Sequence, residues 1–314
     1  MGNFDKYRFS GHETFPFRYA WLPKAFSTIQ EYPKIFSDEN TAMVKLGVGK
    51  NMVRAIRFWA EVTNIIDKLR TGGWEVTPFG RSLFNKNGFD PFLEDSQTFW
   101  LLHWKLSTQF SEPLFAWDYL LNRWHDSEFS KSAVMITFEQ ECNRIGKKLS
   151  STTLAHHFDT FVHTYLPTRG VKAKIREENL DCPLTELEIL VRVGDRQIDD
   201  EAGKREPIYA FRFETKPEIS PELFAYSIAD YFIRKHPTEF TLPFREIAVG
   251  HGSPGQVFKL PEIGIRERLE NLHQYSRGLL IYDESANIQQ IRRKNDLQLS
   301  LLLESIYKRE FSYA

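Results

Sequence analysis

The sequence predicts a mainly α-helical protein with small β-hairpins (an α+β fold), built from tandem winged helix-turn-helix-like modules. Two observations predict this fold class. Short helical segments, with apolar residues three to four positions apart, alternate with brief strand pairs around Gly or Asp turns. A similar order of elements also recurs three times along the chain. We therefore expect three units, which span residues 1–90, 91–216 and 217–314.

The first unit holds the clearest module. Residues 39–46 are predicted to form a short helix, and a Gly-Val-Gly turn leads to a longer helix at 50–62 with one apolar face. Residues 65–77 predict two short strands around a Gly-Gly turn. A further helix at 77–84 has Thr77 as its N-cap and proline in its first turn. Helix, turn, helix and hairpin is the order of a winged helix-turn-helix.

The second unit begins with a tryptophan-rich helical spacer at 92–125. A weaker copy of the module follows, and its hairpin has a long polar tip that we expect to be mobile. Its helices and strands are expected at 132–149, 151–166, 184–190, 191–193 and 208–213.

The third unit repeats the same order at the C-terminal end. Helices are predicted at 221–235 and 262–276, and a loop rich in Gly and Pro joins them at 250–260. A hairpin with an acidic turn follows at 279–293. An amphipathic helix at 297–307 closes the unit.

The overall composition is that of a soluble globular protein. Of the 314 residues, 41% are hydrophobic and 26% are charged, which excludes wholesale disorder. The apolar runs are too short and too broken for a membrane span, and the N-terminus lacks the apolar core of a signal peptide. Cys142 and Cys182 are too few for a disulfide framework or a zinc knuckle. We therefore expect a cytoplasmic protein with no membrane partner.

Charge is distributed unevenly along the chain. Residues 1–89 contain thirteen Lys or Arg and eight Asp or Glu, a difference of +5 in a chain whose net charge is −1. This excess coincides with the predicted recognition helix, so double-stranded DNA is the expected partner. The side chains expected to contact the phosphates and base edges are Lys50, Asn51, Arg54 and Arg57. A winged helix that binds protein is the alternative, because the fold alone does not specify its ligand.

Several segments together resemble a bacterial domain-of-unknown-function family typified by SspB, the DNA nickase of the single-strand DNA phosphorothioation (Ssp) phage-defence system. The resemblance starts with Phe-Ser-Gly-His-Glu-Thr-Phe (9–15), Arg18 and Trp-Leu-Pro-Lys (21–24). It continues through Leu-Gly-Val-Gly-Lys-Asn-Met-Val-Arg (46–54), Thr-Pro-Phe-Gly (77–80), Leu-Glu-Asp-Ser-Gln-Thr-Phe-Trp-Leu-Leu-His-Trp (93–104) and Gly-Ser-Pro-Gly-Gln-Val-Phe-Lys-Leu (252–260). These segments keep one order over nearly the whole chain.

The resemblance implies a protein that nicks one strand of duplex DNA and so allows sulfur to be incorporated as a phosphorothioate. It also implies three partner proteins: a cysteine desulfurase, an ATPase and an ATP pyrophosphatase-like protein. Two alternatives remain open. The chain is either a non-catalytic DNA-recognition adaptor that positions the sulfur-transfer partners, or a protein-interaction scaffold without affinity for DNA.

Strand nicking usually needs a divalent metal, here magnesium or manganese, held by carboxylates or His. The first candidate site is the N-terminal motif. His12 is expected to act as general base, Glu13 as catalytic residue and metal ligand, and Arg18 as a phosphate clamp. Alternatively, the motif is an arm whose His12 and Glu13 form hydrogen bonds with a neighbouring domain.

Other candidate residues lie further along the chain. The glycines at 250–255 are able to expose backbone N–H groups to an anion, with Ser253 and Lys259 completing a phosphate contact. A tight loop between helices is the alternative. Thr153 is expected to touch the DNA backbone if the second module docks like the first. The pair Glu214 and Lys216 fits half of a restriction-type nuclease site, but a solvated strand end explains it as well.

Overall fold

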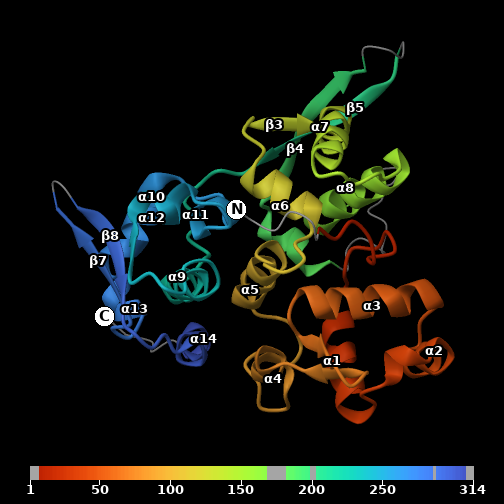
Figure 1. Cartoon of the computed structure of the whole chain (residues 1–314), viewed down its shortest axis with the longest axis horizontal. Coiled ribbons are helices and arrows are strands. Elements are labelled where there is room, and N and C mark those ends of the chain that lie inside the picture. Colours follow the sequence, from red (N-terminus) through yellow and green to blue (C-terminus); the bar gives the residue numbers. More distant parts are fainter. Residues whose placement is uncertain (1–6, 168–181, 199–202, 286–287, 309–314) are drawn as a thin grey trace.

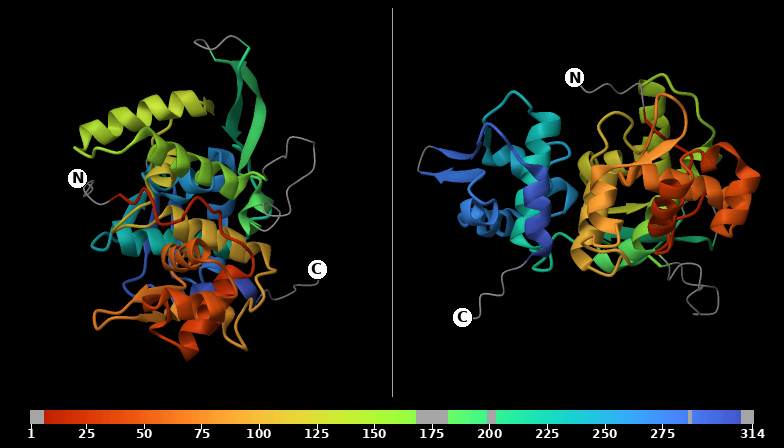
Figure 2. Two further views of the ribbon diagram at one scale, coloured as in Figure 1. Left: turned by 90° about the vertical axis from the view of Figure 1, so that its right-hand side faces the viewer. Right: turned by 90° about the horizontal axis from the view of Figure 1, so that it is seen from below.

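The computed structural model describes residues 7–167, 182–198, 203–285 and 288–308. The chain forms a larger lobe, from the N-terminal arm to strand β5, and a smaller C-terminal lobe that begins at helix α9 (Figure 1). Seen from below, the two lobes lie side by side, and in the other view the β4–β5 hairpin projects from the larger one (Figure 2). The fold is mixed and mainly helical with small antiparallel sheets, as predicted.

The first part of the larger lobe has the predicted order of elements. Asp38 caps the short second helix by accepting hydrogen bonds from the N–H groups of Asn40 and Thr41, and Gly47 ends that helix in a left-handed conformation with φ of 66°. The longer third helix buries its apolar face against the first helix. The elements are α1 (Trp21–Glu31), the 3₁₀ turn η2 (Ile35–Ser37), α2 (Glu39–Leu46), α3 (Lys50–Val62), β1 (Ile66–Lys68), β2 (Trp74–Val76) and α4 (Pro78–Phe84).

The middle of the chain differs more from the prediction. The expected strand pair is longer, and a third strand, β3, joins it in the antiparallel order β3-β5-β4. The helix expected at 184–190 is a 3₁₀ turn, and residues 199–202 of the hairpin tip lie outside the described residues. The elements are α5 (Ser96–Ser107), α6 (Phe115–Asn122), β3 (Glu128–Ser130), α7 (Lys131–Arg144), α8 (Ser151–Tyr165), η4 (Pro183–Leu187), β4 (Leu190–Gln197) and β5 (Arg205–Phe211).

The smaller lobe surrounds the buried helix α9, which packs against the last helix, α14. The helix expected at 262–276 is interrupted at Asn271 and forms two helices, α12 and α13. The expected hairpin gains a strand and has the order β6-β8-β7. The elements are α9 (Pro221–Lys235), β6 (Thr241–Pro243), α10 (Phe244–Val249), α11 (Pro254–Val257), α12 (Glu262–Glu270), α13 (Leu272–Tyr275), β7 (Leu280–Glu284), β8 (Gln289–Arg293) and α14 (Leu299–Tyr307).

Aromatic side chains hold the larger lobe together. Trp59 of α3 and Trp117 of α6 are fully buried and meet edge to face, with ring centroids 6.0 Å apart. The N-terminal arm crosses this lobe, and the indole N–H of Trp59 donates to the carbonyl of Phe15 at 2.9 Å. No described helix is long and apolar enough to cross a membrane.

Candidate functional site

The polar face of α3 lies on the outside of the molecule. Lys50 and Asn51 are exposed, and the side chains of Arg54 and Arg57 retain 37% and 38% of their exposure. Lys50, Arg54 and Arg57 are three or four residues apart, so these three cations share one face of the helix. We call Lys50, Asn51, Arg54 and Arg57 the α3 surface.

Two carboxylates partly neutralise the α3 surface. Glu39, at the start of α2, accepts hydrogen bonds from Lys50 Nζ at 2.8 Å and Arg54 Nε at 2.7 Å, which lower the pKa of the carboxyl. Arg57 Nε lies 4.0 Å from Glu61 Oε1. Such solvent-exposed pairs are weak, so these cations are able to exchange the carboxylate for another anion.

His12 does not face solvent. Its Nε2 lies 3.1 Å from Nδ1 of His157 in α8, and its Nδ1 contacts the Thr14 N–H and the Thr160 hydroxyl. Burial lowers the pKa of His12 to about 4. The buried, neutral ring therefore contradicts the prediction that His12 acts on DNA as a general base. The alternative prediction, an arm bonded to a neighbouring part of the protein, matches its contacts.

Glu13 and Arg18 lie at the surface end of the same arm. Glu13 is half-buried with a φ of 50°, and its charge acts on nearby Arg54. In the part of the chain that the structure describes, no three His, Cys, Asp or Glu side chains gather to hold a metal ion. Arg18 is half-buried, with its guanidinium 5.5 Å from the ring centroid of Trp21.

Two other predicted phosphate contacts are wrong, because their side chains are buried. The Ser253 hydroxyl caps α11 by accepting from the Gln256 N–H at 3.4 Å. Lys259 donates to the Leu121 carbonyl, and burial together with neighbouring Lys216 lowers its pKa to about 7.

Lys216 is itself buried, so it does not form a nuclease site with Glu214. Thr153 is half-buried in the first turn of α8, where its N–H is capped by Ser150.

The loop between α10 and α11 presents a histidine that sequence reasoning did not select. A turn closes where the Ser253 N–H donates to the Gly250 carbonyl at 3.0 Å, and Gly252 adopts a φ of 73°, which favours glycine. Gly255 is equally constrained, because a Cβ there would lie 2.1 Å from the Ala248 carbonyl oxygen. These constraints fix the position of His251.

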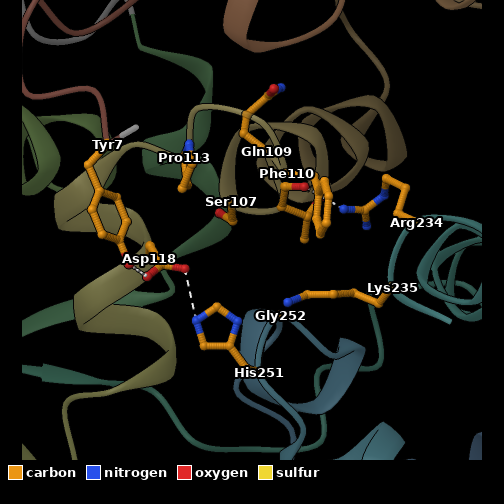
Figure 3. A pocket seen from close by; sticks show the side chains of 11 residues that line it. Tyr7, Ser107, Gln109, Phe110, Pro113, Asp118, Arg234, Lys235, His251 and Gly252 are labelled. Carbon is orange, nitrogen blue, oxygen red and sulfur yellow. Dashed lines mark hydrogen bonds and ion pairs between the residues drawn. The ribbon is translucent and has the colours of Figure 1, made fainter. Parts of the chain in front are cut away.

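His251 reaches across to the larger lobe (Figure 3). Its Nε2 lies 3.0 Å from Oδ1 of Asp118, a buried residue of α6. The other carboxylate oxygen of Asp118 accepts a hydrogen bond from the Tyr7 hydroxyl at 2.7 Å. Burial and the adjacent carboxylate raise the pKa of Tyr7 above its usual range, so the phenol keeps its proton. Asp118 therefore holds the Nε2 edge of the His251 ring in place.

Two cations from the end of α9 complete this pocket, which we call the interlobe pocket. Lys235 extends toward His251 (Figure 3). Arg234 is held by Asp230 at 2.7 Å and by the Thr108 carbonyl. The cavity has a volume of about 90 Å³. That is room for several water molecules but far less than the roughly 300–1,000 Å³ of a pocket for a drug-sized ligand.

Comparison with known proteins assigns the chain to a family. A family model described as "Protein of unknown function (DUF4007)" matches residues 9–307. The chain belongs to the DUF4007 family. A comparison with curated proteins found no match to this chain.

Two crystal structures of SspB share the fold of this DUF4007 protein. The magnesium-bound SspB structure has a TM-score of 0.83 at 24% identity, over 99% of this chain and 93% of that one. The second SspB structure has a TM-score of 0.77 at 23% identity, over 94% of this chain and 86% of that one. At this identity, the likeness establishes the fold.

The buried histidines predict an acid-sensitive fold. Burial lowers the pKa values of His12 and His103 to about 4, whereas the unfolded chain binds these protons near pH 6.5. Because the unfolded state gains protons first, the free energy of unfolding falls as the pH drops from 6.5 toward 4. Between pH 7 and pH 5 we expect a loss of about 2 kcal/mol per buried histidine in urea titrations.

The variant His12→Asn should show a shallower pH dependence than the wild type. Substituting the exposed His125 in the same way is the control and should leave the slope unchanged. Equal slopes for the wild type and His12→Asn would contradict the assigned burial of His12.

Proposed function

We propose that this DUF4007 protein binds duplex DNA through the α3 surface and nicks one strand in a bacterial DNA phosphorothioation system directed against phage. Family membership and the SspB-like fold support this proposal. The order α2, turn, α3 and β1–β2 hairpin agrees with a winged helix whose second helix enters the major groove. The tandem winged-helix arrangement is part of the same proposal.

The α3 surface is the observation that carries the DNA-binding part. Arg54 and Arg57 are half-exposed. Arg54 pairs with Glu39, and Arg57 lies near Glu61 and 5.7 Å from the centroid of the Trp74 ring, which leaves both guanidinium groups able to reach phosphates. Exposed Asn51 stands at the N-terminal end of the helix, the part that contacts base edges in a recognition helix. An Asn side chain there is able to form two hydrogen bonds with an adenine.

The likeness to SspB supports a set of protein partners. We propose a cysteine desulfurase, an ATPase and an ATP pyrophosphatase-like protein as partners in the cytoplasm. Magnesium or manganese belongs in the reaction mixture because one SspB structure carries magnesium. Glu13 as a ligand of that metal stays a prediction.

A second function is a DNA-recognition adaptor that positions the sulfur-transfer partners without cutting. One observation favours it: the described residues contain no three-ligand metal group. Relaxation of supercoiled plasmid separates the two functions. With magnesium or manganese, the nickase converts supercoiled plasmid into open circles, and the adaptor binds the plasmid but leaves it supercoiled.

Removal of the two arginines tests the DNA-binding surface. Arg54→Ala combined with Arg57→Ala should weaken duplex binding and lower the slope of log affinity against log salt by about 1.8, because two phosphate contacts are lost. Arg245→Ala with Lys294→Ala removes two exposed cations of the smaller lobe and serves as the control. Fluorescence anisotropy at several salt concentrations measures both quantities. An unchanged slope in the α3 variant would show that the α3 surface does not contact the DNA phosphates.

Glu39→Gln tests the same surface with the opposite sign. The substitution removes the carboxylate that competes with phosphate for Lys50 and Arg54, so we expect tighter duplex binding. The effect should shrink as salt rises, since salt screens exposed charges. Equal or weaker binding at low salt would show that DNA does not approach these two cations.

A further inference from the structure

We propose that the interlobe pocket is a phosphodiester-cleaving site in which His251 acts as the general base. The inference rests on the proposed nicking function and names the residues that carry it out. The pocket joins groups from three separate parts of the chain: Tyr7 of the arm, Asp118 of α6, and Lys235 with His251 of the smaller lobe. Such convergence of polar groups on one small cavity is typical of a reactive site.

The orientation of His251 suits a base. Its Nε2 lies against Asp118 Oδ1, which favours the tautomer with the proton on Nε2 and the lone pair on Nδ1. Among the residues that the structure describes, Nδ1 has no hydrogen-bond partner, and the side chain retains 43% of its exposure. Asp118 is a positioning residue. It fixes the tautomer and stabilises the imidazolium that forms, as a carboxylate behind a catalytic histidine does.

The wall opposite Asp118 attracts an anion. Lys235 has no carboxylate within 4.0 Å in the described part of the chain, and its ammonium lies 5.8 Å from the centroid of the Phe110 ring. Its neighbour Arg234 shares the single carboxylate of Asp230 with Lys105, so this side retains an excess positive charge. A phosphate group matches both the charge and the size of the cavity. Exposed Phe110 offers a flat surface for the adjoining base.

The step consumes one water molecule and involves no oxidant or reductant. His251 Nδ1 accepts a proton from the water, whose oxygen forms a bond to phosphorus. The bond between phosphorus and one sugar oxygen breaks, and the leaving oxygen takes a proton from the Lys235 ammonium. Burial lowers the pKa of Lys235, which favours this transfer. The products are a phosphate monoester end and a hydroxyl end, and both side chains then exchange protons with solvent.

The test compares His251→Ala with a matched histidine in the full-length protein. His236 Nε2 lies 3.2 Å from Glu246 Oε1, so it is also a histidine paired with a carboxylate, but it does not line the pocket. We expect His251→Ala to nick supercoiled plasmid at least ~100-fold more slowly than the wild type. Added imidazole should restore part of the rate. His236→Gln should nick like the wild type, and all three proteins should bind duplex DNA equally.

Asp118→Asn adds a readout that a structural defect would not reproduce. It should lower kcat and leave KM for plasmid unchanged, since Asp118 acts on the base and not on the bound strand. If His251→Ala nicks as fast as the wild type, the interlobe pocket is not the cleavage site, while the proposed nicking function still stands. A loss that imidazole does not rescue would also overturn the general base. A wild-type protein that never nicks would overturn both nicking and this site, whereas duplex affinity would still test the α3 surface.

Discussion

The N-terminal arm is the constraint on which the rest of the structure depends. Within a few residues it contacts α6 through Tyr7, α8 through His12 and α3 through Phe15. Gly11 makes this path possible, because a Cβ there would lie 2.7 Å from the Phe58 ring and its φ is 111°. The family motif at 9–15 is therefore a structural clamp between helices that are far apart in sequence.

The same arm connects the two surfaces for which we propose a function. One end, Tyr7, supports the carboxylate behind His251, and the other end packs on the helix that carries the α3 surface. In the proposed function, the arm therefore links the bound DNA to the interlobe pocket. The pocket itself depends on both lobes, since Asp118 and His251 belong to different ones (Figure 3). A change in the lobe arrangement would separate base from carboxylate without altering either lobe.

Local signals explain what the sequence predicted well. The cap at Asp38, the glycine at position 47 and the apolar spacing of 50–62 act within a few residues, so α2 and α3 appear where they were expected. β3 was missed because its three residues gain their strand conformation only by pairing with β5, far along the chain. His12 was misjudged for a related reason, since burial against His157 is not a property of the local sequence. The pair of Asp118 and His251 was missed likewise, because Asp118 lies in an apolar helix and His251 in a glycine-rich loop, and only the fold brings them together.

A structure of this protein bound to a duplex is the decisive measurement for the DNA-binding surface. We expect α3 in the major groove, with Arg54 and Arg57 released from their carboxylates to phosphates. Contact of DNA with any other face, while Arg54 still binds Glu39, would contradict it.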